Sequence, residues 1–119
     1  MPSATTSVAM YRIVAAGAFW AAPEPLGKAF GMATPPDQPG TFLGRIFASR
    51  DVALGVGVAQ SSGAARQHWL KVGVGVDAID VAAALLAGRS GALSRWGTVA
   101  CFGASALALG LGIAALGEE

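Results

Sequence analysis

The chain has 119 residues, which is enough for one compact domain. Hydrophobic residues make up 54% of the chain and charged residues 13%, about half of the roughly 25% typical of soluble domains. A formal net charge of +1 without any Lys/Arg cluster argues against a nucleic-acid partner. The single cysteine, Cys101, excludes an internal disulfide and a cysteine-based metal site.

Four long stretches of the chain carry few charges and are separated by helix-breaking or polar segments. They span about 4–22, 41–60, 68–86 and 96–116, and the breaks between them include "PEP", "SSG" and "GRSG". Each stretch has about 19 to 21 residues, the length that a helix needs to cross roughly 30 Å of hydrocarbon. The sequence therefore predicts one all-α domain over 1–119, folded as an antiparallel four-helix transmembrane bundle.

Other features agree with a membrane location. Trp20, Trp69 and Trp96 lie at the ends of the apolar stretches, where interfacial aromatic residues concentrate. The segment "LGKAFGM", 26–32, is predicted to form a short interfacial helix. The first stretch is not interpreted as a signal peptide, because its basic residue, Arg12, lies inside the apolar run.

Glycine-rich and small-residue patterns bear on the fold and on how the helices pack. Alternating "GVGV" at 55 and 73 also suits buried strands of a soluble protein, but the stretches lack the polar face that such a protein would show. In the last stretch, small residues recur three or four positions apart and predict a smooth face for close packing against a neighbour. These residues are Gly103, Ala106, Gly110, Ala114 and Gly117.

Charged residues interrupt the middle of two of the apolar stretches. Arg50 and Asp51 lie at the midpoint of 41–60, and Asp77 lies at the midpoint of 68–86. Asp80 is three residues after Asp77 and shares its helix face. A charge at the centre of a bilayer costs roughly 2.5–3.5 kcal/mol on insertion scales. We therefore expect these side chains to face the interior of the bundle and to contact one another.

The balance of charge in this group depends on which other arginines join it. Arg50 alone leaves an excess of two carboxylates, and Arg45 and Arg12 are the candidates to complete the group. With both, the network is neutral and structural. With only one, a proton must reside on a carboxylate, and Asp77 and Asp80 are the expected pair to share it. A protonated carboxyl group beside a carboxylate can act in acid–base catalysis or in proton relay.

Three segments of the chain match a known pattern. They are "YRIVAAGAFWAAPEPLGKAFG", "GRIFASRDVALGVG" and "GVDAIDVAAAL", and the most specific element is Arg50-Asp51 followed by Leu54-Gly55. With these segments the chain resembles the DoxX-like group of small four-span membrane proteins, in particular its uncharacterised actinobacterial-type branch. The resemblance implies a four-helix membrane bundle whose signature residues are Arg50, Asp51 and the two later aspartates. It does not imply a particular reaction.

The first functional hypothesis is an enzyme that acts on a lipophilic small molecule from the bilayer. Asp77 or Asp80 would activate water or abstract a proton, and a protonated partner carboxyl oriented by Arg50 would donate one. This combination is similar in residue types to the water-activating site of limonene-type epoxide hydrolases. Epoxide opening, cyclisation and double-bond isomerisation need no cofactor or metal. The catalytic candidates are Asp77, Asp80, Asp51 and Arg50, and the supporting candidates are Arg45, Arg12 and Tyr11.

Two further hypotheses use the same residues differently. In a proton-coupled transporter the aspartates would load and release protons, and four spans would require a dimer. In a non-catalytic accessory subunit the charges would only hold the helices together. In that case the stripes of small residues would be the surfaces for a partner. The expected partners of the chain are membrane lipid, a lipophilic small molecule and, in a homo-oligomer, a further copy of the chain. The expected location is a multi-pass site in a bacterial-type inner membrane.

Overall fold

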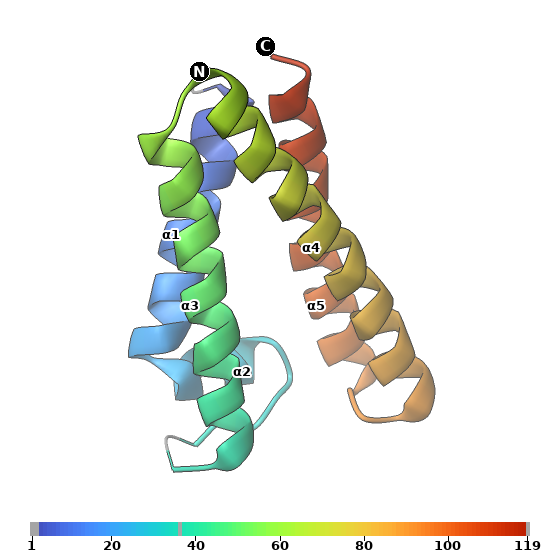
Figure 1. Ribbon diagram of the computed structural model, residues 1–119. Coiled ribbons are helices and arrows are strands. Elements are labelled where there is room, and N and C mark those ends of the chain that lie inside the picture. Colours follow the sequence, from blue (N-terminus) through green and yellow to red (C-terminus); the bar gives the residue numbers. More distant parts are fainter. Residues whose placement is uncertain (1–2, 36, 119) are drawn as a thin grey trace.

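The computed structural model describes residues 3–35 and 37–118, and its regular structure in these ranges is entirely helical. Its elements are α1 (Ala4–Ala21), α2 (Pro23–Ala29), α3 (Pro39–Gln60), α4 (Gly63–Ser90) and α5 (Arg95–Leu116). The four long helices run alternately in opposite directions (Figure 1). The all-α prediction is confirmed, and each predicted apolar stretch corresponds to one long helix.

The helix ends follow local sequence signals. Ser3 begins α1, because its hydroxyl oxygen accepts a hydrogen bond from the backbone N–H of Thr6 at 3.1 Å. Ser94 begins α5 in the same way. Pro23 occupies the first turn of α2, where the missing N–H costs nothing, so the "PEP" segment starts a helix as well as ending α1. Gly91, with φ of +84°, ends α4 in a left-handed conformation that favours glycine.

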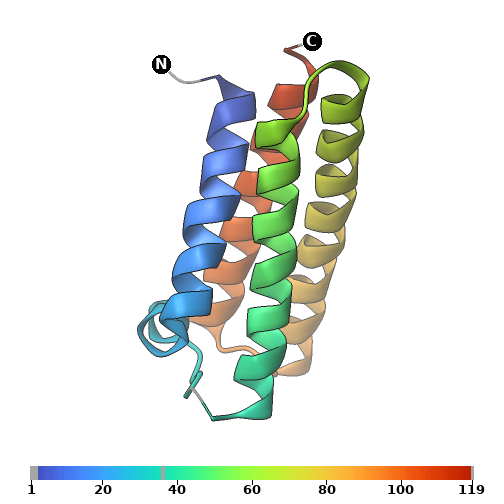
Figure 2. The same ribbon diagram turned by 60° about the vertical axis from the view of Figure 1, so that its left-hand side comes forward.

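The long helices pack as two pairs. α1 lies along α3, and α4 lies along α5, while α1 also contacts α5. Both termini lie at the same end of the molecule, where the pairs come together (Figures 1 and 2). At the other end the pairs diverge, and α2 lies beside this end of α1 (Figure 1).

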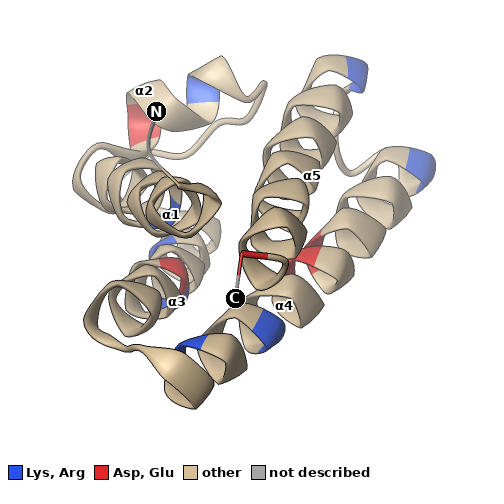
Figure 3. Ribbon diagram, turned by 90° about the horizontal axis from the view of Figure 1, so that it is seen from above, with Lys and Arg blue, Asp and Glu red and all other residues tan. Residues whose placement is uncertain are grey.

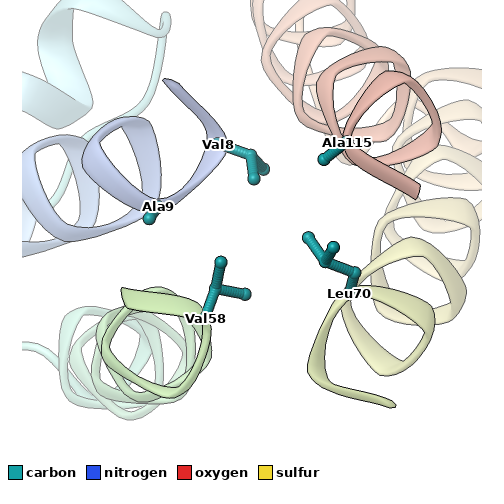
Figure 4. Close-up of a cluster of buried hydrophobic side chains, with 5 residues drawn as sticks. All are labelled: Val8, Ala9, Val58, Leu70 and Ala115. Carbon is teal, nitrogen blue, oxygen red and sulfur yellow. The ribbon is translucent and has the colours of Figure 1, made fainter. Parts of the chain in front are cut away.

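A small apolar core joins the two pairs near the termini. Val8, Ala9, Val58, Leu70 and Ala115 are each at most 3% exposed and form one cluster. Figure 4 shows that they come from all four long helices and that Val8, Val58, Leu70 and Ala115 point into the space between these helices. Farther along the bundle the buried apolar residues include the small side chains of Ala16, Ala48, Ala84 and Ala108, which leave room for polar contacts and for a cavity.

The small-residue face predicted for α5 is not the face that packs within the chain. A Cβ atom added at Gly103 or Gly110 would meet no other group within 4 Å. Ala108, Gly112 and Ala115 are buried instead. The physical reason is that α5 is apolar and largely small on every side, so residue size alone does not select one face.

One helix in the described part of the chain, α5, is long and apolar enough to cross a membrane. The other long helices, α1, α3 and α4, do not meet the same criterion of length and composition. α1 carries one charged residue, Arg12, whereas α3 and α4 each carry three or more, and charge lowers the mean hydropathy of a helix. The structure thus confirms four long helices but not four membrane spans.

Candidate functional site

A network of charged side chains lies directly beyond the apolar core. Arg12 follows Val8 by one helical turn on α1. On α4, Asp77 follows the core residue Leu70 by two turns, about 10 Å along the axis. The same level of the bundle receives side chains from α3, so three helices meet through ionic contacts. The members are Arg12, Arg50, Asp51, Asp77 and Asp80.

The buried half of the network is the pair Arg12–Asp77. Arg12 Nη1 lies 3.1 Å from Asp77 Oδ1 and Arg12 Nη2 lies 2.6 Å from Asp77 Oδ2, a two-pronged contact that uses both carboxylate oxygens. The side chains are 4% and 3% exposed. Because a buried charge is tolerated only when it is well paired, this geometry explains how an arginine is accommodated in the middle of α1.

Two glycines make room for the Arg12 side chain. A Cβ atom at Gly73 would lie 2.7 Å from Arg12 Nη2. A Cβ atom at Gly55 would lie 2.9 Å from the backbone oxygen of Ala9 and 3.1 Å from Arg12 Cβ. Glycine at these positions lets α3 and α4 approach Arg12 closely, so the helix packing and the ion pair depend on one another.

The second half of the network is more open. Arg50 Nη2 lies 3.1 Å from Asp80 Oδ2 and 3.8 Å from Asp51 Oδ1, and Arg12 Nη1 reaches the same Asp51 oxygen at 3.4 Å. The Asp51 and Asp80 side chains are 32% and 33% exposed. The guanidinium of Arg50 also lies over the Phe47 ring, 5.3 Å from its centre.

Asp51 and Asp80 each keep one carboxylate oxygen free of hydrogen bonds and ion pairs with residues 3–35 and 37–118. These atoms are Asp51 Oδ2 and Asp80 Oδ1. Asp77, by contrast, has both oxygens engaged by Arg12. The three carboxylates therefore differ in what they have left to offer a bound molecule.

Arg45 is not part of the network. Its Nε donates a hydrogen bond to the backbone oxygen of Trp20 at 3.0 Å, and its guanidinium lies 5.3 Å from the centre of the Trp20 ring. Arg45 precedes Arg50 by five residues on α3, which places it more than one turn away from the centre of the helix. With Arg12 inside and Arg45 outside, the network holds one more carboxylate than guanidinium.

Tyr11 lies beside the network without joining its ion pairs. Its hydroxyl donates a hydrogen bond to the backbone oxygen of Ala104 on α5, at 2.9 Å. Consecutive residues of a helix point about 100° apart, so Tyr11 is directed toward α5 while Arg12 is directed toward α3 and α4. Tyr11 therefore ties α1 to α5 at the level of the charges.

A cavity of about 660 Å³ extends from the network away from the core. It lies between the two helix pairs, whose arrangement is seen in Figure 1, and it reaches the α2 segment at its far end. All five charged residues border it, and α5 contributes Cys101 and Ser105. The rest of the wall is mainly apolar and includes Phe19, Leu26, Phe30, Met32, Ala84 and Ala108. A pocket with an apolar body and a few convergent polar groups is typical of small-molecule sites.

The chemistry of this site comes from carboxyl and guanidinium groups. Within the described ranges, no group of three His, Cys, Asp or Glu side chains is placed to hold a metal ion. Comparison with models of protein families, with curated proteins and with solved structures found no match to this chain. The function is therefore inferred from the geometry of the network and of the cavity.

Proposed function

We propose that the four long helices lie in a lipid bilayer. Large apolar side chains are exposed along all four, for example Val14 on α1, Phe42 on α3, Leu86 on α4 and Ile113 on α5. Monomeric soluble proteins rarely expose apolar surface on this scale, whereas acyl chains would cover it favourably. Apart from Arg95 at its start, α5 carries no charge, as the colouring of Figure 3 illustrates. The charges that lower the hydropathy of the other helices include the inward-facing network.

The membrane proposal is tested by fractionation. We expect the protein to stay in the membrane pellet after extraction with alkaline carbonate and to require detergent for release. Release by carbonate alone would contradict an integral location.

We infer that the cavity binds a lipophilic small molecule and that the network performs acid–base chemistry on it. The observation that supports this proposal is the position of Asp51 and Asp80: both border the apolar cavity, both are about one-third exposed, and each has a free oxygen. Arg50 contacts both carboxylates and holds them at one end of the cavity. A carboxyl pair in such a position can divide the roles of acid and base.

In this proposal the buried pair Arg12–Asp77 has a positioning role. Both Asp77 oxygens are engaged, so Asp77 is a poor base for a substrate proton. Arg12 Nη1 contacts Asp51 as well, which lets the buried pair fix the Asp51 carboxylate from behind. The proposed acid–base residues are therefore Asp51 and Asp80, with Arg50 between them.

The proposed reactions are those that need an acid and a base but no cofactor: epoxide opening, cyclisation and double-bond isomerisation. A carboxyl group would donate a proton to the substrate, and the second would accept one from water or from a substrate carbon. The resemblance to the DoxX-like group is compatible with this proposal, since it implies the same residues in a four-helix membrane bundle.

The experiment compares turnover by wild type and by two acid-to-amide variants in lipid nanodiscs. The substrates are lipophilic epoxides, polyenes and β,γ-unsaturated ketones, and products are identified by gas chromatography with mass spectrometry. We expect Asp51→Asn and Asp80→Asn each to lower turnover by about 10²-fold or more. Asp37→Asn, in the exposed loop before α3, is the matched control and should retain full activity. Absence of turnover by wild type, or undiminished turnover by both folded variants, would contradict the proposal.

A second candidate, proton-coupled transport, is favoured by one observation. The carboxylate in excess lies on the wall of a cavity between two helix pairs, so it is placed to load a proton beside a bound solute. The discriminating measurement is solute flux into proteoliposomes under an imposed pH gradient. Flux that follows the gradient and is lost in Asp80→Asn would support transport over catalysis.

A further inference from the structure

The charge of the cavity lining restricts which kind of reaction it can assist. Among the described residues that border the cavity, the cationic side chains are Arg12 and Arg50, against three aspartates. Both guanidiniums are already paired with carboxylates. One carboxylate therefore lacks a cation of its own, and beside the apolar wall of the cavity a proton or the positive charge of a ligand would compensate it.

We propose that the reaction begins with protonation of the substrate and passes through a transition state with positive charge on a substrate carbon. This proposal rests on the acid–base function proposed above and narrows it to acid-initiated reactions, such as epoxide opening or cyclisation.

The first step balances as follows. The carboxylic acid of Asp51 or Asp80 transfers its proton to the epoxide oxygen, and the electron pair of the breaking C–O bond goes to that oxygen. Positive charge develops on the carbon, while the acid becomes the carboxylate that the network has in excess. The new carboxylate and the positive charge on the substrate carbon lie at the same end of the cavity, where low dielectric strengthens their attraction.

Aromatic side chains line other parts of the cavity wall, where they can stabilise a positive charge on the substrate. Tyr11, Phe19 and Phe30 line the cavity, and the face of an aromatic ring attracts a cation. Phe47 already lies beneath the Arg50 guanidinium, which shows the same interaction at the mouth of the network. An apolar cavity lined by rings and carboxylates is thus complementary to an amphipathic cation.

The opposite order, in which a carboxylate first removes a proton from carbon, is less well served by this site. It would leave a negative charge on the substrate, and the two cations that border the cavity among the described residues, Arg12 and Arg50, already contact aspartates. Arg50 Nε has no hydrogen-bond partner among these residues, but it is buried, and the carboxylates beside Arg50 would repel the anion. The charge distribution therefore favours acid-initiated chemistry over base-initiated isomerisation.

The experiment uses a stable cation that imitates the charge of the transition state. The probe is 4-phenylbutyl(trimethyl)ammonium, and its control is the uncharged analogue with a tert-butyl group in place of the ammonium. Binding of each to the protein in nanodiscs is measured by equilibrium dialysis at pH 8, with empty nanodiscs as the blank. We expect the cation to bind at least tenfold more tightly than the neutral analogue after correction for partition into lipid.

Variants locate the source of this preference. Asp51→Asn and Asp80→Asn should each lower the affinity for the cation at least tenfold and leave that for the neutral analogue within about twofold. Asp37→Asn, the control of the same chemistry in the exposed loop, should change neither. Bound cation should also slow the alkylation of Cys101, the single cysteine of the chain, because Cys101 borders the cavity.

The outcomes separate this inference from the proposed function. Equal affinity for the two probes, with Cys101 protected by both, would overturn the cationic transition state and leave a cavity that binds lipophilic molecules. Binding of neither probe would overturn both proposals. A preference for the cation that persists in both aspartate variants, or that leaves Cys101 unprotected, would place the cation outside this site and overturn the inference.

Discussion

The three network aspartates predict different losses of stability when each is changed to asparagine. Asp77→Asn removes the carboxylate that neutralises Arg12, whose side chain is only 4% exposed. What remains to Arg12 is one contact with Asp51 at 3.4 Å. Removing one partner of a buried ion pair costs about 3–5 kcal/mol because the other charge stays buried without compensation. We expect Asp77→Asn to lower the free energy of unfolding by about this amount.

Asp80→Asn is the matched comparison on the same helix. Asp80 is 33% exposed and has a single contact, 3.1 Å from an arginine that is itself 37% exposed. Ion pairs with this access to solvent contribute about 0.2–1 kcal/mol. The expected difference between the two variants is therefore about 2–5 kcal/mol, a large fraction of the 5–15 kcal/mol typical of a whole domain.

The assay is reversible unfolding in mixed micelles, titrated with sodium dodecyl sulfate and followed by far-ultraviolet circular dichroism. A double variant, Arg12→Met with Asp77→Leu, distinguishes the loss of charge pairing from the loss of packing. It removes both buried charges and keeps similar volume, so it should be more stable than Asp77→Asn alone. Equal losses for Asp77→Asn and Asp80→Asn, or a double variant less stable than Asp77→Asn, would refute the buried pairing of Arg12.

Two further predictions concern the helix contacts. Gly73→Ala places a methyl group 2.7 Å from Arg12 Nη2 and should cost about 1–3 kcal/mol in the same unfolding assay, whereas Gly75→Ala, which meets no atom within 4 Å, should be neutral or stabilising by up to about 1 kcal/mol. Equal effects would contradict the close approach. Hydrogen bonds from Thr5 and from the start of α1 lower the pKa of Glu118 below its ordinary 4.5. The stabilising contribution of Glu118 is therefore complete above pH 4.5 and is lost as the pH falls through the lowered pKa. Glu118→Gln should reduce the fall of the melting temperature between pH 6 and pH 3. An unchanged fall would contradict a stabilising role of these hydrogen bonds.

The sequence predicted that the charged side chains contact one another, because a charged residue in an apolar segment is costly unless it is paired inside the bundle. Arg50, Asp51, Asp77 and Asp80 stood out against their surroundings, and the cost of exposing them to hydrocarbon placed them together. The pairing within the group was not predictable in the same way. Asp77 and Asp80 share a helix face, yet each contacts a different arginine, since the choice depends on how α1 is rotated about its axis.

Other features lacked a signal of comparable strength. The face that α5 buries was not predictable. Alanine, glycine and leucine occur on every side of the helix, so no face contains a residue that would be costly to bury or to expose. From the sequence the tail "GEE" is expected to be only a hydrated end, but Glu118 accepts hydrogen bonds from the backbone N–H groups of Ala4 and Thr5 at 2.7 and 2.9 Å. That contact joins residues 114 and 113 positions apart in the sequence, and only the fold brings them together.

Different residues along the bundle stabilise the fold and carry the proposed chemistry. The apolar core and the Arg12–Asp77 pair hold the two helix pairs at one end, so the two carboxylates beside them, Asp51 and Asp80, need contribute only little to holding the fold. Asp51 and Asp80 can therefore keep an unpaired oxygen and partial exposure. A charge left incompletely paired beside an apolar cavity is costly unless something else occupies it, a proton before the reaction or a cation during it. The residues that are least well satisfied by the protein are for this reason the ones that we assign to the substrate.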